Sequence, residues 1–528
     1  MSHAAEIQNG LCSIGIEFGS TRIKAVLIGT DYSPLASGVY EWNNSLIEGI
    51  WTYSLDEVKQ GLQGCFADLM QQTKAQYGVA LTTAAGIGIS AMMHGYLAFD
   101  AAGELLVPFR TWRNTITAEA AEELTKVFSF NIPQRWSIAH LYQSILNHEP
   151  HVAIIAYLTT LAGYVHGLLT GEKVLGVGDA SGMFPIAENG CTYDETMLSA
   201  FDELTASTAF GKKLADVLPR IVAVGECAGT LTKDGARLLD PTGTFAAGVP
   251  LCPPEGDAQT GMVATNSIKP RTGNVSAGTS IFAMTVLERG LTAVYPEIDL
   301  VTTPCGDPVA MVHCNNCSSD LDAWVKMFGG FLHKVGVEMS KSALYDAFYQ
   351  LAAEGMPDCG GIVSYNYYSG EHVTGLSSGK PLMMRTPTAE FTPENLTRSL
   401  VYSSMATLKI GMDILTQKEQ VRVEQIYAHG GLFKNPIATQ RFLAAALGVD
   451  VTLMESAGEG GAWGIALLAA YMSRADRRET LSEYLNQRVF ARMSGKRLSP
   501  DAADAAGIAS YIETYKKGLA AERAAVEL

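Results

Sequence analysis

The chain has 528 residues, too many for one ordinary hydrophobic core, so two large domains are expected. Hydrophobic residues make up 47% of it and charged residues 17%, a balance that is typical of a packed globular enzyme and argues against a disordered or fibrous chain. The formal net charge of −16, from 54 acidic and 38 basic residues, disfavours a nucleic-acid partner and favours small-molecule ligands.

Location is predicted from three features. The start, MSHAAEIQNGL, lacks a basic stretch followed by an apolar core, so no export signal is expected. Nine scattered cysteines predict a reducing cytoplasm, and the one close pair, in HCNNC (313–317), is interpreted as core thiols because zinc would need two more ligands. The most membrane-like run, residues 152–169, is predicted as a buried helix, since it contains two threonines, two glycines and His166. No membrane partner is expected, and a homodimer is the candidate assembly.

The first half of the chain alternates short apolar runs with amphipathic segments, which predicts an α/β architecture. Strands are predicted at residues 12–20, 23–29 and 84–93. Helices, with apolar positions near a 3.6-residue period, are predicted at residues 55–73 and 117–128.

The second half repeats the opening pattern. GNVSAGTSIFAMTVL (273–287) has the same construction as GIEFGSTRIKAVLI (15–28): a strand, a glycine–hydroxyl turn and a second apolar strand. Either turn alone, Gly19-Ser20-Thr21 or Gly278-Thr279-Ser280, is typical of an ordinary hairpin. As matched halves they predict two similar α/β domains that together form a two-sided phosphate clamp.

A domain boundary is expected in the polar segment 262–272, which divides the chain into residues 1–265 and 266–528. Further along, glycine clusters at 430–436 and 458–464 each precede a predicted helix. Such turns let backbone N–H groups approach a nucleotide, although either cluster alone is typical of a plain strand-to-helix loop.

Two common nucleotide motifs are excluded. GIGISA (86–91) mimics the dinucleotide fingerprint, but MMHGYLAF follows it instead of a helix, and no acidic residue stands about twenty residues later. No G-x-x-x-x-G-K-[ST] sequence occurs either. Neither a nicotinamide enzyme nor a P-loop protein is therefore expected.

Eight segments occur in a fixed order: GIEFGSTRIK, SAMMHG, TWRN, GDASG, PEGDAQTG, SAGTS, HGGLFKNP and EGGAWG. In this order, from about residue 12 to about residue 475, the chain resembles the FGGY family of carbohydrate kinases, and most closely its xylulokinase-like members. The resemblance implies two RNase H-like domains of the actin and hexokinase type around a central cleft. It further implies transfer of the γ-phosphate of ATP, with Mg²⁺, to a terminal hydroxyl of a ketopentose.

On local grounds Asp257, in PPEGDAQTG (253–261), is typical of a turn. The resemblance instead makes it the catalytic aspartate that accepts the proton of the sugar hydroxyl, and Glu255 is expected to point the other way along the strand. Asp179 is interpreted as a structural residue that fixes its own turn.

For the sugar, the resemblance implies contacts from Met93, His94 and Trp112 together with Asp257. The pair Arg113-Asn114 replaces the Asn-Asp of xylulokinases, so another ketose or alditol (L-ribulose, L-xylulose, erythritol or glycerol) stays open as substrate.

Glu17 stands where the family has Asp and is the implied Mg²⁺ contact, often through water; the alternatives are a surface strand-end residue and a non-catalytic sugar-sensing homologue. The implied nucleotide residues are Ser20, Thr21 and Lys24 at the first turn, Gly278, Thr279 and Ser280 at the second, and Gly430, Gly431 and Asn435 around adenosine. Ala462 and Gly464 match a helix start that walls the adenosine pocket. Lys24 is equally interpreted as a surface charge, and the tail after about residue 476 has no assigned function.

Overall fold

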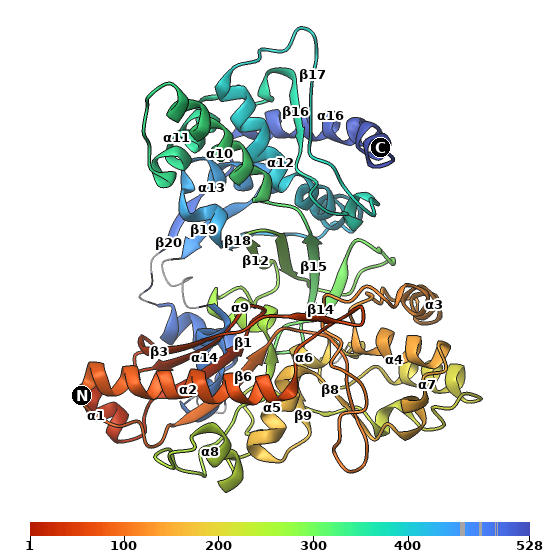
Figure 1. Cartoon of the computed structure of the whole chain (residues 1–528), viewed down its shortest axis with the longest axis vertical. Helices are drawn as coiled ribbons and strands as arrows, with labels where there is room; N and C mark the ends of the chain where they lie inside the picture. The colour runs from red at the N-terminus through yellow and green to blue at the C-terminus, as the bar shows by residue number, and fades with distance from the viewer. Residues whose placement is uncertain (189, 455–459, 475–477, 492, 494) are drawn as a thin grey trace. The chain divides into compact units, whose positions relative to one another are not determined.

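The computed structural model describes residues 1–188, 190–454, 460–474, 478–491, 493 and 495–528 (Figure 1). The chain forms two compact units. The first unit comprises Met1–Ile268, Leu300–Val309 and Gly458–Arg492; the second comprises Lys269–Asp299, Ala310–Ala457 and Met493–Leu528. After the predicted boundary near residue 265 the chain therefore returns twice to the first unit.

The first unit is built on a five-stranded sheet with the order β11-β6-β1-β2-β3. Its strands are β1 Ser13–Phe18, β2 Arg22–Ile28, β3 Pro34–Glu41, β6 Gly86–Ala91 and β11 Glu255–Gly256. β2 runs antiparallel to β1 and β3, whereas β6 runs parallel to β1 and β11. Every residue of β6 is buried, which explains its continuous apolar sequence, and the three predicted strands of this half are confirmed.

Two long helices pack on this sheet. α2 (Leu55–Tyr77) packs against β2 and β3, and α14 (Gly460–Arg474) packs against β1 and β6. A Cβ atom at Gly15 would lie 2.0 Å from the carbonyl oxygen of Ala462, so β1 needs glycine where α14 crosses it. α2 confirms one predicted helix, and α3 (Ala118–Phe128) confirms the other.

The remaining elements of the first unit are short. They are α1 His3–Gln8, β4 Ser45–Ile47, β5 Ile50–Thr52, β7 Leu97–Phe99, α4 Ser137–Leu146, η1 Pro150–Ile154, β8 Tyr157–Thr159, α5 Leu161–Thr170, β9 Val174–Gly176, α6 Val177–Ala180, α7 Glu195–Thr205, η2 Leu214–Asp216, β10 Arg220–Val222, α8 Lys233–Leu239, α9 Asp257–Ala264, α15 Leu481–Tyr484 and η8 Leu485–Val489.

The prediction of one buried helix across residues 152–169 is wrong in its first half. That half forms the end of η1 and the strand β8, and only α5 is helical. The break occurs at Thr160, whose hydroxyl accepts a hydrogen bond from the N–H of Gly163 and so caps α5 at its start. Within the described parts of the chain, no helix combines the length and the apolar character needed to cross a membrane.

A second sheet supplies most of the strands of the second unit, while most of its strand β14 (Asp299–Thr302) is assigned to the first unit. This seven-stranded sheet has the order β14-β15-β13-β12-β18-β19-β20. Its strands are β12 Thr272–Ala277, β13 Ile281–Val286, β14 Asp299–Thr302, β15 Pro308–Cys314, β18 Gln425–His429, β19 Asp450–Met454 and β20 Gly495–Leu498. β13 runs antiparallel to β12 and β18 runs parallel to it, as β2 and β6 do with respect to β1. This shared pairing confirms the predicted repeat.

Helices surround the long central helix α12 of this unit, which is buried along most of its length and packs against α11, α13 and β16. The remaining elements of the unit are α10 Ser319–Lys334, α11 Lys341–Glu354, η3 Cys359–Gly361, β16 Ile362–Tyr365, η4 His372–Thr374, β17 Leu382–Arg385, α12 Pro393–Asp413, η5 Ile414–Lys418, η6 Gly431–Lys434, α13 Pro436–Leu447 and α16 Ala502–Val526. The helices predicted after both late glycine clusters are confirmed as α13 and α14.

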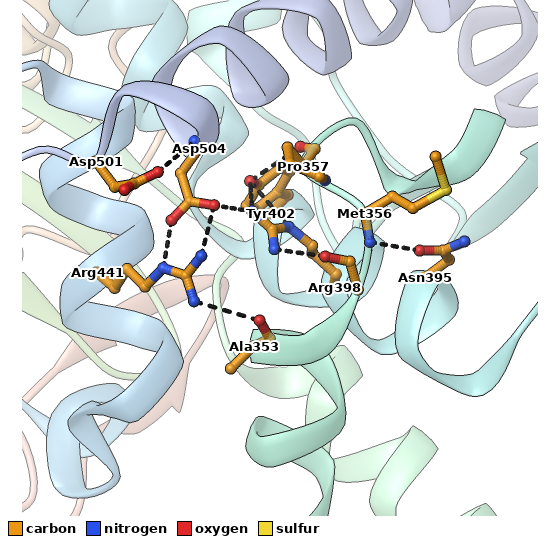
Figure 2. A network of polar contacts seen from close by, with 10 residues as sticks. Ala353, Met356, Pro357, Asn395, Arg398, Tyr402, Arg441, Asp501 and Asp504 are labelled. Atoms are coloured by element: carbon orange, nitrogen blue, oxygen red, sulfur yellow. Dashed lines mark hydrogen bonds and ion pairs between the residues drawn. The ribbon is translucent and has the colours of Figure 1, made fainter.

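The C-terminal tail is anchored by a buried ionic cluster, shown in Figure 2. Asp504 on α16 is fully buried and accepts hydrogen bonds from Arg398 on α12 and from Arg441 on α13. Asp501 caps the start of α16 by accepting from the N–H of Asp504 at 2.9 Å. Because β20 also extends the sheet beside β19, the last part of the tail, Met493–Leu528, completes the second unit.

Candidate active site

Asp257 lies where a short strand becomes a helix. β11 ends at Gly256, and Asp257 is the first residue of α9. One carboxylate oxygen, Oδ1, accepts hydrogen bonds from the N–H groups of Met93 (3.3 Å) and Ala258 (2.9 Å). Burial raises the pKa of the Asp257 carboxyl to about 6, while these N–H groups oppose the rise. A partly exposed carboxylate with this pKa suits a general base.

Glu255 is kept apart from Asp257 by the change of structure, not by strand alternation. Residues two apart in a strand share a face, so the alternation argument is wrong. The strand ends between them, and Glu255 instead accepts hydrogen bonds from the N–H groups of Asp179 (2.9 Å) and Gly178 (3.4 Å). Burial, and then the charge of Asp179, raises the pKa of Glu255 to about 8. Glu255 is buried and thus fixes the backbone of Gly178 and Asp179 by hydrogen bonds.

Met93 and His94 follow β6 in the loop that contacts Asp257. His94 is buried with a left-handed backbone (φ 66°), and its ring stacks on Trp136 with 6.1 Å between the ring centres. Its Nδ1 lies 3.1 Å from the carbonyl oxygen of Gly182, and a Cβ atom at Gly182 would come within 2.8 Å of that nitrogen. The structure therefore brings Met93, His94 and Asp257 together.

Asp179, in the GDASG segment, is fully buried. Its Oδ2 accepts a hydrogen bond from the hydroxyl of Thr160 at 2.6 Å. The carboxylate therefore joins α6 to the start of α5, whereas the sequence predicted that it would fix its own turn. Burial raises the pKa of Asp179 to about 7; Thr160 opposes this rise, and the charge of Asp257 adds to it. Asp179 is therefore a structural residue whose carboxylate interacts electrostatically with that of Asp257.

Trp112 is half-buried against the apolar core of the first unit, and its contact with a sugar stays a prediction. The two residues that follow it, Arg113 and Asn114, contact Trp51 of β5. Asn114 accepts from the N–H of Trp51 (2.9 Å) and donates to the carbonyl oxygen of Trp51 (2.8 Å), while the Arg113 guanidinium lies 3.9 Å from the Trp51 ring centre. The residues that depart from the xylulokinase pattern thus form a bracket around Trp51.

Glu17 lies on β1 directly opposite Lys24 of β2. Its carboxylate reaches the start of α14, where a Cβ atom at Gly461 would lie 2.2 Å from Glu17 Oε1. Burial, and then the charge of Asp257, raises the pKa of Glu17 to about 7, while the backbone of Ala462 and the charge of Lys24 oppose the rise. Glu17 is partly exposed near the end of β1 and is electrostatically coupled to Asp257, and its role as the Mg²⁺ contact stays a prediction.

The first turn (residues 19–21) is fastened by two buried aromatic side chains. Trp42 Nε1 donates to the carbonyl oxygen of Gly19 (2.7 Å), its N–H to that of Thr21 (3.2 Å), and the Tyr53 hydroxyl to that of Ser20 (2.6 Å). The two rings stack with centres 4.2 Å apart. No hydrogen bond within the described residues occupies the N–H or hydroxyl groups of Ser20 and Thr21. Such groups are suited to phosphate oxygens.

The second turn (residues 278–280) joins β12 to β13. The carbonyl oxygen of Gly278 accepts from the N–H (3.1 Å) and the hydroxyl (2.6 Å) of Ser318, and that of Thr279 accepts from the N–H of Cys317 (3.0 Å). Across the described part of the chain, nothing hydrogen-bonds to the N–H or hydroxyl groups of Thr279 and Ser280. The second turn therefore offers the same donors as the first.

The GGLFKNP segment lies between β18 and α13. Gly430 has φ 106°, and a Cβ atom there would come within 2.3 Å of the carbonyl oxygen of Ala277, which precedes the second turn. Gly431 begins η6, and Asn435 Nδ2 donates to Asp346 Oδ1 of α11 at 2.7 Å. The loop predicted to bind adenosine thus lies beside the second turn within one unit.

Two models of the FGGY family of carbohydrate kinases match the chain. The N-terminal domain model matches residues 12–264, and the C-terminal domain model matches residues 273–473. The chain belongs to the FGGY family of carbohydrate kinases. The predicted family and α/β fold are confirmed, and this FGGY kinase is a carbohydrate phosphotransferase of a family that uses ATP as the phosphate donor.

Relatives of this FGGY kinase include a xylulose kinase of Haemophilus influenzae, which is 24% identical over 85% of this chain and 91% of that protein. The fold is shared with a ligand-bound xylulose kinase from Lactobacillus acidophilus, with TM-score 0.78, 16% identity and coverage of 97% of this chain and 99% of that one. It is also shared with Plasmodium falciparum glycerol kinase with ADP, with TM-score 0.75, 15% identity and coverage of 97% and 98%.

Sequence reasoning missed one group of residues in this FGGY kinase, and another group stays a prediction. Gly464 packs against α9 in the first unit, where a Cβ atom would lie 2.0 Å from the carbonyl oxygen of Thr260, and Ala462 lies beside Glu17. The place of these two residues in an adenosine wall stays a prediction. The fasteners Trp42, Tyr53 and Ser318 were missed because their partners lie 23 to 40 residues away.

Proposed function

We propose that this kinase transfers the γ-phosphate of ATP to a terminal hydroxyl of a xylulose-like ketopentose, with Asp257 as the general base. The observation that carries the proposal is the hydrogen bond from the Met93 N–H to the Asp257 carboxylate, which joins the proposed base to the loop that presents His94. Similarity to xylulose kinases supports the ketopentose as substrate.

The proposed proton transfer follows from the hydrogen bonds of Asp257. Its Oδ1 is engaged by two N–H groups, and no hydrogen bond from a described residue occupies Oδ2. With a pKa of about 6, the carboxylate is mostly ionised at neutral pH. Oδ2 then accepts the proton of the sugar hydroxyl as that oxygen bonds to the γ-phosphorus and the bond to the ADP leaving group breaks.

His94 orients the sugar in this proposal. Because the carbonyl oxygen of Gly182 only accepts hydrogen bonds, the His94 Nδ1 beside it carries a proton. The loop that carries His94 is also bonded to Asp257 through the Met93 N–H, so the His94 ring and the proposed base are held on one support, and positioning is the main demand of phosphoryl transfer.

The two turns bind the phosphates in this proposal. Each supplies the N–H and hydroxyl groups of two consecutive residues, Ser20 and Thr21 in one unit and Thr279 and Ser280 in the other. Backbone donors bind anions without added cations, which agrees with the acidic composition of the chain.

A Mg²⁺ ion fits the carboxylates of the first unit. Glu17 and Asp257 are oxygen donors of the kind that Mg²⁺ prefers, and their mutual repulsion, which contributes to the raised pKa of Glu17, is what a divalent cation relieves. Glu17 would hold the ion, directly or through water. When bound, it would neutralise charge on the phosphates of ATP.

A kinase for another ketose or an alditol is the second candidate. The observation in its favour is the bracket around Trp51, which engages Arg113 and Asn114 where xylulokinases carry Asn-Asp. The glycerol kinase that shares this fold supports a polyol as the alternative substrate.

An ADP-release assay over D-xylulose, L-xylulose, L-ribulose, erythritol and glycerol tests both candidates. The proposal predicts the highest kcat/KM with D-xylulose. A higher value with another ketose or alditol replaces the substrate assignment and keeps the kinase. Absence of stimulation by every sugar, in protein shown to bind ATP, overturns the kinase proposal in favour of a sugar-sensing homologue.

A further inference from the structure

The loop that fastens the second turn is itself held by a buried carboxylate. This loop, residues 315–318, connects β15 to α10. Glu371 lies 56 residues after Asn315, in the segment that connects β16 to η4, and it is fully buried. Its Oε2 accepts hydrogen bonds from the N–H groups of Asn315 (2.9 Å) and Asn316 (3.3 Å) and from Asn316 Nδ2 (3.3 Å).

Asn316 makes the second set of contacts between the loop and the segment before Glu371. Its Oδ1 accepts from the N–H groups of Tyr368 (2.9 Å) and Ser369 (3.0 Å), and its side chain is buried. One residue later, the carbonyl oxygen of Cys317 accepts from Asn366 Nδ2 at 2.9 Å. The loop is therefore fixed at successive residues by one segment, residues 366–371.

These contacts reach the second turn through the planar peptide group. In a trans peptide the C=O and the following N–H point in opposite directions, so a bond that holds one carbonyl aims the next N–H. Ser318 holds the Gly278 carbonyl and thereby aims the N–H of Thr279. Cys317 holds the Thr279 carbonyl and thereby aims the N–H of Ser280.

We infer that Asn316 and Glu371 are positioning residues for the nucleotide: through residues 317–318 they aim the two backbone donors of the second turn at a phosphate group. This inference deepens the proposed function and rests on it only in taking the ligand of the turn to be a nucleotide phosphate. It also gives a role to the HCNNC segment, whose last three residues belong to the loop.

A merely structural role for Glu371 makes a different prediction. The second unit holds another fully buried glutamate, Glu522 on α16, whose Oε1 accepts from the N–H of Lys380 at 2.7 Å. Glu371→Gln and Glu522→Gln each replace a buried carboxyl group of which one oxygen accepts a hydrogen bond from a backbone N–H. Both substitutions are therefore expected to lower the stability of the second unit by a similar amount. Only Glu371→Gln is expected to weaken nucleotide binding.

The test measures the Kd of a non-hydrolysable ATP analogue by calorimetry, together with Tm. Asn316→Ala and Ser318→Ala are expected to raise this Kd about three- to tenfold, the effect of losing a hydrogen bond that orders the turn. Ser318→Thr retains the hydroxyl and is expected to bind within about twofold of wild type. Glu522→Gln is expected to lower Tm with the Kd unchanged.

Wild-type Kd values in folded Ser318→Ala and Glu371→Gln overturn the inference, as does a Glu522→Gln variant that weakens binding equally. If Asn316→Ala fails to fold, the Ser318 pair decides. Because binding is measured without sugar, failure of the proposed function appears separately, as wild-type protein that binds the analogue but shows no sugar-stimulated ADP release.

Discussion

The first and second turns offer the same donors but are fastened by different means. In the first, Trp42 and Tyr53 hold the carbonyl oxygens directly with rigid, stacked side chains. In the second, backbone and hydroxyl groups of a loop hold the carbonyls, and that loop depends on Glu371. The proposed phosphate binding therefore depends on the conformation of the turn, and the residues that hold this conformation differ between the two units.

The two halves of the repeat differ at a carboxylate of the proposed active site. Two residues before the glycine of the first turn stands Glu17, which is coupled to Asp257; the same position before the second turn holds Ser276. The second unit therefore repeats the strand–turn–strand construction without this acid. In the proposed function, the duplicated turns bind phosphate and the unduplicated carboxylates take part in the chemistry.

The largest expected effect is on the anchor of the second unit. Asp504→Ala leaves the buried Arg398 and the neighbouring Arg441 without their carboxylate, and it is expected to lower the free energy of unfolding of that unit by about 3–5 kcal/mol. Asp501→Ala removes only a helix cap and is expected to cost about 0.5–2 kcal/mol. Urea unfolding with separate transitions for the two units measures both, and equal losses would show that the ionic cluster adds nothing beyond the cap.

Next in size is the aromatic fastening of the first turn. Tyr53→Phe removes the donor that holds the Ser20 carbonyl and aims the N–H of Thr21, so the KM for ATP is expected to rise about three- to tenfold. Tyr77→Phe removes a comparable bond to the carbonyl oxygen of Leu35 in the same unit and is expected to leave this KM unchanged. Steady-state kinetics at saturating sugar separates the two, and an unchanged KM in Tyr53→Phe would break the analogy between the turns.

Much of the fold followed from local pattern. The strand–turn–strand units at 13–28 and 272–286 and the helix at 55–77 carry their period in the sequence. The run 152–169 did not, because uniform apolarity lacks a period and a capping threonine divides it. Local pattern also gave no indication of Trp42, Tyr53 and Ser318 as the residues that hold the two turns, because their hydrogen-bond partners are distant in sequence.

The candidate site was predictable where short motifs carry its residues. Met93, His94 and Asp257 lie together as their motifs implied. Strand alternation failed for Glu255 because residues two apart in a strand share a face; the two carboxylates separate because β11 ends at Gly256. The role of Ala462 in an adenosine wall stays a prediction, because a glycine-rich helix start fits either a nucleotide or a close-packed strand, and α14 packs on β1.

The pH dependence of turnover is the next, smaller effect. The proposed base acts when ionised, so kcat/KM is expected to rise with pH through about 6, the pKa of Asp257, and to fall below it. Because the pKa of Glu17 is about 7, Glu17 is mostly protonated and uncharged where Asp257 titrates, so Glu17→Gln is expected to leave this acid limb in place. An acid limb that moves to lower pH in Glu17→Gln would show that Glu17 is already ionised when Asp257 titrates.

The smallest change is expected from Glu17→Asp. It restores the residue that the family carries at the first turn, so activity is expected to be retained or raised. Because Glu17 reaches the backbone at Gly461, total loss of activity would instead show that the start of α14 is built around the longer side chain. The kcat and the Mg²⁺ concentration at half-maximal rate distinguish these results.

The most direct test is the sugar-stimulated turnover of Asp257→Asn, measured together with its affinity for a non-hydrolysable ATP analogue. If both turns bind phosphate while Asp257 alone accepts the proton, kcat falls about 10²- to 10⁴-fold and the affinity stays within about twofold of wild type. Near-normal turnover in Asp257→Asn would contradict the account.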